Sequence, residues 1–141
     1  MNFNKSLLVT FILSIFFISI NANAGLQTKN YTNEDSSVRV TSGIIKPCSS
    51  QAGVYTPKKD KNGKPGVSYV GNTEIIILCA TSKHDICTAN IYKTNNCSGH
   101  KIGRASLNLK TKTIINAAPT NPLYVFLVEN NGTLLKIKYN K

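Results

Sequence analysis

Tryptophan is absent from this chain of 141 residues, and only 6 acidic residues and two histidines occur. Without Trp, the strongest side chain for stacking on sugar rings is missing, so we interpret the six tyrosines as half-buried strand residues. No pair of carboxylates is indicated for glycoside hydrolysis. There is no C-x-x-C redox motif and no G-x-S-x-G nucleophile motif. His84 and His100 are the only imidazoles that a hydrolase could use, and we expect no enzyme.

Long apolar runs are also absent, except near the start of the chain. Residues 7–20, "LLVTFILSIFFISI", follow Lys5, and the small-x-small pattern Ala22-Asn23-Ala24 predicts cleavage before Gly25. This layout is typical of a secretory signal peptide. The alternative is a retained membrane anchor, which needs about 20 apolar residues. We predict a signal peptide at residues 1–24, no transmembrane segment after its cleavage, and a protein exported to the bacterial periplasm or secreted.

Four cysteines are present, and three of them share residues 79–100, "CATSKHDICTANIYKTNNCSGH", with both histidines. Thiolate and imidazole are the ligands that zinc prefers. The spacing C-x4-H-x2-C-x9-C-x2-H nevertheless lacks the close cysteine pair of common zinc sites, and exported thiols become oxidised. The sequence therefore predicts two disulfides, with no metal and no cofactor.

Strand geometry separates the possible disulfide pairings. If residues 86–94 form a strand, its far end lies roughly 20 Å from Cys87 at 3.3 Å per residue, and Cys97 follows just beyond that end, too far from Cys87 for a disulfide. If residues 73–79 and 86–93 form a hairpin, Cys79 faces Cys87 at one end, which leaves Cys48 for Cys97. We favour Cys79–Cys87 with Cys48–Cys97. The alternative, Cys48–Cys87 with Cys79–Cys97, applies if those strands belong to different sheets.

Short strands punctuated by turns dominate the pattern, and no stretch has a helical period over ten residues. Alternating or β-branched segments bounded by Gly, Pro and Asn are typical of strands. About seven such strands favour an all-β fold, a small antiparallel β-sandwich, with a small β-barrel as the alternative. We expect residues 25–36 to be a mobile polar leader and residues 37–141 a single domain. The predicted strands are 38–45, 54–56, 67–80 (one long or two broken), 86–94, 102–109, 111–118, 123–129 and 133–139.

Positive charge exceeds negative charge by a wide margin. The net charge is +11, and removal of Lys5 with the signal peptide lowers it to +10. Such a field attracts polyanions and anionic surfaces. The loop "PKKDKNGKPG" (57–66) supplies a candidate anion-binding set, and its alternative is a solvated loop tip. Lysine outnumbers arginine 15 to 2, although arginine is the better bidentate ligand for carboxylate or phosphate. The candidate anion-binding residues are Lys58, Lys59, Lys61 and Lys64.

These features predict a non-enzymatic binding or interaction protein. The expected partners are an anionic glycan, a lipid surface or an acidic protein, and no specific nucleic acid. The alternative is a structural or assembly subunit of a cell-surface appendage or secretion apparatus, because the alternating C-terminal segment "TLLKIKY" (133–139) could add a strand to a neighbour's sheet.

Overall fold

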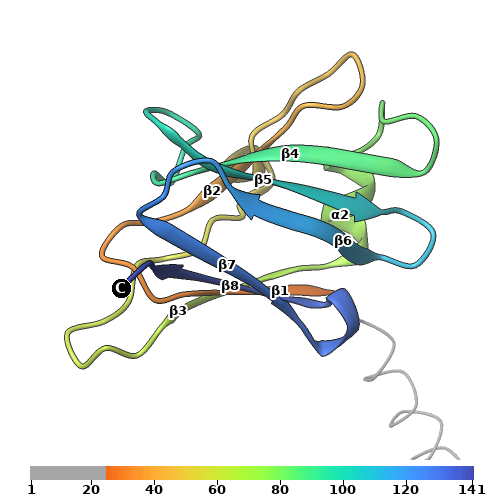
Figure 1. The fold of residues 1–141 in the computed structure, drawn as a ribbon. Coiled ribbons are helices and arrows are strands. Elements are labelled where there is room, and N and C mark those ends of the chain that lie inside the picture. Colours follow the sequence, from red (N-terminus) through yellow and green to blue (C-terminus); the bar gives the residue numbers. More distant parts are fainter. Residues whose placement is uncertain (1–24) are drawn as a thin grey trace, which may run out of the picture.

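Two sheets pack face to face in the computed structural model, which describes residues 25–141 (Figure 1). The predicted signal peptide lies outside the described residues. The first sheet has the strand order β3-β1-β8-β7 and the second β2-β4-β5-β6. The predicted all-β sandwich is confirmed, and the sheets do not close into a barrel. The strands are β1 (Leu26–Asn30), β2 (Ser37–Val40), β3 (Gly66–Val70), β4 (Ile86–Tyr92), β5 (Lys101–Asn108), β6 (Thr113–Pro119), β7 (Tyr124–Glu129) and β8 (Leu134–Tyr139).

The segment 72–78, "NTEIIIL", was predicted as a strand, and this prediction is wrong. It forms the helix α2 (Asn72–Leu78), which lies at one end of the sandwich (Figure 1). Its burial follows a helical spacing, because Ile75 and Leu78 are buried while Ile76 and Ile77 are 61% and 60% exposed. A run of β-branched residues favours a strand, but a helix places Ile75 and Leu78, three residues apart, on one face that can be buried. Tertiary packing therefore overrides local propensity.

The expectation of a mobile polar leader at residues 25–36 is also wrong, because Leu26–Asn30 forms the strand β1 and the turn after it is ordered by its own polar groups. Asn30 is 0% exposed. Its side-chain amide donates to the carbonyl of Glu34 at 2.7 Å, and its Oδ1 accepts from the backbone N–H and the hydroxyl of Thr32 at 3.0 and 2.8 Å. Asparagine commonly orders a turn through such bonds to the following residues. A polar sequence without a period can thus be buried when its hydrogen bonds are made internally.

Strand β1 occupies the interior of the first sheet. It pairs antiparallel with β3 and parallel with β8, with Gln27 opposite Leu134 and Asn30 opposite Ile137. Strand β8 therefore has neighbours on both sides, since β7 pairs with its other edge. The expectation that residues 133–139 could extend a neighbour's sheet is wrong, because strand addition needs a free edge.

The apolar interior divides into two clusters. One cluster joins the two sheets through Ile91 and Ile102 of the second sheet and Phe126 and Ile137 of the first. The other is built from α2 and the ends of β2 and β4. A cavity of about 130 Å³ borders residues of both clusters.

Both predicted disulfides are confirmed. Cys48–Cys97 has a Cα separation of 6.0 Å, and Cys79–Cys87 one of 5.8 Å. The hairpin that was expected to bring Cys79 opposite Cys87 does not form, because Cys79 ends the helix α2 and not a strand. Cys79–Cys87 thus fastens α2 to the start of β4. Cys48–Cys97 fastens the short 3-10 helix η2 (Ser49–Ala52), which follows Cys48, to the loop between β4 and β5.

A partly buried polar contact also links the turn after β1 to β7. The hydroxyl of Tyr124 donates to Oε2 of Glu34 at 2.6 Å, and Lys93 lies 3.4 Å from Oε1 of the same carboxylate. Burial raises the pKa of the Tyr124 phenol well above its usual range, and the bond to Glu34 raises that pKa further.

Loss of each disulfide should lower stability according to the loop that it closes. The separations are 49 and 8 residues. The chain-entropy estimate predicts a loss of about 4 kcal/mol for the double variant Cys48→Ser/Cys97→Ser and about 2.5 kcal/mol for Cys79→Ser/Cys87→Ser. Urea unfolding under non-reducing conditions, followed by circular dichroism, measures both. Equal losses, or a larger loss for the short loop, would contradict this order.

Tyr124→Phe should remove the bond to Glu34 and lower the unfolding free energy by about 1.5 kcal/mol at pH 7. An unfolded tyrosine ionises near pH 10, whereas folded Tyr124 stays protonated. Its contribution is therefore fully present below about pH 10 and is lost as pH rises further. Urea unfolding between pH 7 and 11 should show a smaller alkaline loss for this variant than for the unmodified protein. Tyr69→Phe, at a residue that is 70% exposed, is the control and should leave that loss unchanged.

Candidate functional site

A polar groove of about 590 Å³ runs across the outer face of the second sheet. The face that carries the groove is built from alternating strand residues. In β4, Cys87 and Ile91 are buried against the first sheet, while Thr88 and Asn90 lie on the opposite face. The groove is lined by Thr41, Thr88, Ala89, Asn90, Arg104, Ala105, Ser106, Asn116, Ala118 and Thr120.

The two arginines of the chain belong to one row of residues across this sheet. Arg39 of β2 lies opposite Asn90 of β4, and Asn90 lies opposite Arg104 of β5. Directly opposed residues on neighbouring strands project from the same face. Ala118 of β6 continues the row beyond Arg104, and its short side chain leaves the Arg104 guanidinium uncrowded on that side.

A second row of hydroxyls and amides runs beside the arginine row. Thr88 lies opposite Ser106, and Ser106 lies opposite Asn116. The Thr41 hydroxyl is 3.0 Å from that of Thr88. These groups donate and accept hydrogen bonds without carrying charge. The groove therefore combines a cation with several neutral polar groups.

The acidic residues of the described chain are engaged elsewhere. Glu34, Asp85 and Glu129 pair with Lys93, Lys110 and Lys136 at 3.4, 3.4 and 2.7 Å. None of the carboxylates in residues 25–141 lines the groove, and neither arginine forms an ion pair with them. The positive charge at Arg104 is therefore not neutralised by a neighbouring acid.

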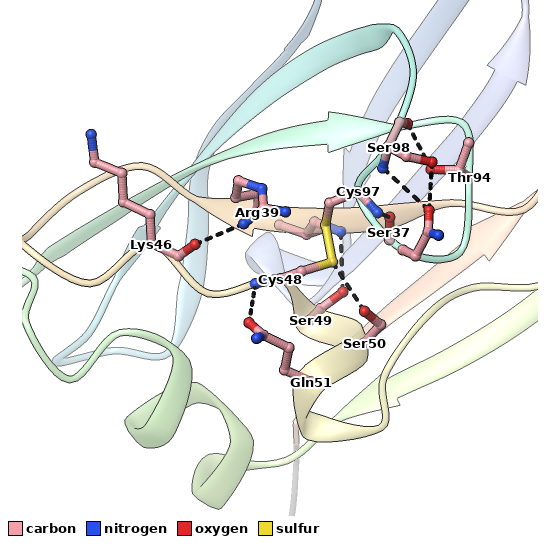
Figure 2. Close-up of a disulfide and its surroundings, with 12 residues drawn as sticks. Ser37, Arg39, Lys46, Cys48, Ser49, Ser50, Gln51, Thr94, Cys97 and Ser98 are labelled. Carbon is pink, nitrogen blue, oxygen red and sulfur yellow. Dashed lines mark hydrogen bonds between the residues drawn. A yellow bond between two sulfur atoms is a disulfide. The ribbon is translucent and has the colours of Figure 1, made fainter.

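Arg39 is held beside the long disulfide (Figure 2). Its Nη1 donates to the carbonyl of Lys46 at 3.0 Å, and the backbone N–H of Val40 donates to the carbonyl of Pro47 at the same distance. The segment 46–48 is anchored at Cys48, whose partner Cys97 donates its N–H to the Ser37 hydroxyl at 2.8 Å. The disulfide thus fixes the backbone carbonyl that Arg39 uses. Arg39 lies opposite the groove residue Asn90 but does not itself line the groove.

The lysine loop predicted as an anion site lies elsewhere. Lys58, Lys59, Lys61 and Lys64 belong to the segment before β3, and none of them lines the groove. This loop already surrounds a carboxylate of its own: Asp60 Oδ1 accepts the backbone N–H groups of Asn62 and Lys64 at 2.9 and 2.8 Å. These amides would otherwise be available to an external anion. The anion-binding role of the four lysines stays a prediction.

The cysteine and histidine cluster does not assemble as ligands. All four cysteines form disulfides, and His84 and His100 are exposed residues outside the strands. Across residues 25–141, no group of three or more metal-ligating side chains gathers around a common point. In the same part of the chain, no helix is long and apolar enough to cross a membrane.

Sequence reasoning missed Arg39 and Arg104. The available signal was their position in "VRV" and "GRASLNL" (103–109), where each arginine alternates with residues that face the core. The order and register of β2, β4 and β5, which place the two arginines in one row, could not be predicted from the sequence.

Comparison with known proteins identifies a shared fold. No family model and no curated protein matches the sequence. Among solved structures, the chain is similar to the Legionella pneumophila type II secretion system substrate NttC, with a TM-score of 0.60 and 22% identity, over 84% of this chain and 100% of that one.

Proposed function

We propose that this is an exported, non-enzymatic binding protein that holds an anionic glycan in the groove of the second sheet. The observation that carries this proposal is Arg104 in a groove that no described carboxylate lines, with Arg39 two strands away in the same row. The lysines, by contrast, are spread over both sheets, the loop before β3 and the connecting turns, and none of those in residues 25–141 lines the groove.

Each part of the groove suits one part of such a ligand. A guanidinium binds a carboxylate or sulfate through two parallel hydrogen bonds. The hydroxyls of Thr88 and Ser106 and the amides of Asn90 and Asn116 match the hydroxyls of a sugar ring. A lipid would need an apolar lining and an acidic protein a broader cationic face, so the glycan fits the lining best.

Different observations support the two other parts of the proposal, namely export and a non-enzymatic role. Two disulfides are typical of proteins that fold in an oxidising compartment, and a type II secretion substrate shares the fold. The lining of the groove consists of hydroxyl, amide, methyl and guanidinium groups. Such groups bind and orient a ligand, whereas hydrolysis usually needs a general acid or base of suitable pKa.

Arg104→Gln should weaken binding of a sulfated or carboxylated oligosaccharide by about tenfold or more, because a charge-assisted pair at that position is lost. Titration calorimetry with a heparin-derived hexasaccharide and an oligogalacturonate measures the effect. Arg104→Lys keeps the charge but loses the bidentate geometry, and we expect an intermediate affinity. A neutral malto-oligosaccharide should bind far more weakly to the unmodified protein.

Lys64→Gln is the matched control, because it removes one positive charge from the lysine loop. We expect less than a twofold change. Equal losses for Arg104→Gln and Lys64→Gln would show that net charge alone attracts the glycan. A larger loss for Lys64→Gln would place the site in the loop. If the protein bound anionic vesicles or an acidic protein more tightly than both oligosaccharides, the proposal of a glycan ligand would be wrong.

A further inference from the structure

The cavity between the sheets is a second feature with the properties of a binding site. Its volume is about 130 Å³, and most of its wall is aliphatic. Leu26 and Val70 of the first sheet, Ile75 of α2, Leu107 of β5 and Leu135 of β8 all contribute. It therefore touches both layers and the helix that closes one end of the sandwich.

Size and lining together restrict what the cavity could hold. A cavity of about 150 Å³ lined by aliphatic and aromatic side chains stays dry and binds benzene or xenon. Water would lose hydrogen bonds against the aliphatic wall. A molecule with about six or seven non-hydrogen atoms matches the available space, and a fused two-ring compound exceeds it.

One part of the wall is polar. Ser49, Thr56 and Ser68 are buried and line the cavity. The hydroxyls of Thr56 and Ser68 lie 2.6 Å apart, and the Ser49 hydroxyl accepts the backbone N–H of Val38 at 3.1 Å. A hydroxyl has one donor and two acceptor positions, so this group retains capacity for one further polar partner. An apolar ligand with a single hydroxyl would use it.

Access does not require either sheet to open. Val54 and Tyr55 lie between η2 and the lysine loop, outside both sheets, and both line the cavity. Tyr55 is also 44% exposed, so its side chain reaches from the cavity wall to solvent. The segment is attached to the strand side through the bridge between Ser36 and Thr56. A local movement of such a segment needs far less energy than unfolding of a sheet.

We propose that this cavity binds a small, largely apolar molecule of the size of benzene with one hydrogen-bonding group, of the phenol class. This site lies on the inner side of the second sheet, whereas the groove lies on its outer face, and Ala89, Ala105 and Ser106 border both. The wall supplies shape and dispersion contacts, and the hydroxyls of Thr56 and Ser68 orient the polar group.

The test is thermal unfolding and titration calorimetry of the purified protein with phenol, benzene and 1-naphthol as probes. We expect a melting temperature raised by roughly 5 °C at about ten times the Kd of phenol. Phenol should bind more tightly than benzene, and 1-naphthol should not bind. Ser68→Ala should reduce the preference for phenol over benzene while leaving benzene affinity unchanged.

Ala89→Leu is designed to fill the cavity, because Ala89 lines it from the middle of β4. It should weaken phenol binding at least about tenfold, with Ala89→Val as a smaller step. Ala80→Leu, at an exposed position, is the control and should bind as the unmodified protein does. Unchanged binding in both Ala89 variants would overturn the proposal. A more stable Ala89→Leu variant, together with no probe binding to the unmodified protein, would identify the cavity as a packing defect.

A direct measurement covers the case in which the Ala89 variants fail to fold. In the unmodified protein saturated with phenol, nuclear Overhauser effects should join the phenol ring protons to the methyl groups of Ile75, Leu107 and Leu135. Their absence at saturation would place phenol elsewhere and overturn the proposal.

Discussion

The first sheet depends on the pairing of β1 with β8, which joins the two ends of the described chain. Strand β1 lies inside the sheet, so β3 reaches β8 only through it. Pairing of two strands from opposite ends of a chain loses the most conformational entropy, because nearly the whole chain must close as a loop before the contact forms. As a result, β1 has no unpaired edge, and the turn at its end is held by the hydrogen bond from the Asn30 side chain to the carbonyl of Glu34. The second sheet then packs against a complete surface.

The distribution of charge separates two roles for cations. Lysines are spread over the surface, and three of them pair with acids, so they set the long-range positive field. The two arginines lie on the central and edge strands of one sheet, where the backbone is held by neighbours. The Cys48–Cys97 disulfide strengthens this by fixing the carbonyl that Arg39 uses. Rigid placement favours a specific geometry of binding, since little side-chain freedom remains to be lost.

Much of the fold could be predicted from the sequence, and the failures share a cause. Alternating segments such as 133–139 and the oxidised state of the cysteines follow from local pattern and compartment, so the sandwich and both disulfides were predicted. The helix α2 could not be, because its isoleucines favour a strand and only burial of Ile75 and Leu78 selects the helix. Strand β1 was missed because its polar neighbours are satisfied by bonds that a linear pattern does not show. The groove could not be predicted, because its residues come together only through the register of the four strands β2, β4, β5 and β6.

The alternation of side chains along β4 and β5 has a consequence for how such a protein can change over generations. Every second residue faces the core and is constrained by packing, while Thr88, Asn90, Arg104 and Ser106 face outward and contribute little to it. Substitutions on the outer face can therefore accumulate with small effects on folding. The scaffold is free to acquire new recognition properties, one exposed residue at a time, without passing through unstable intermediates.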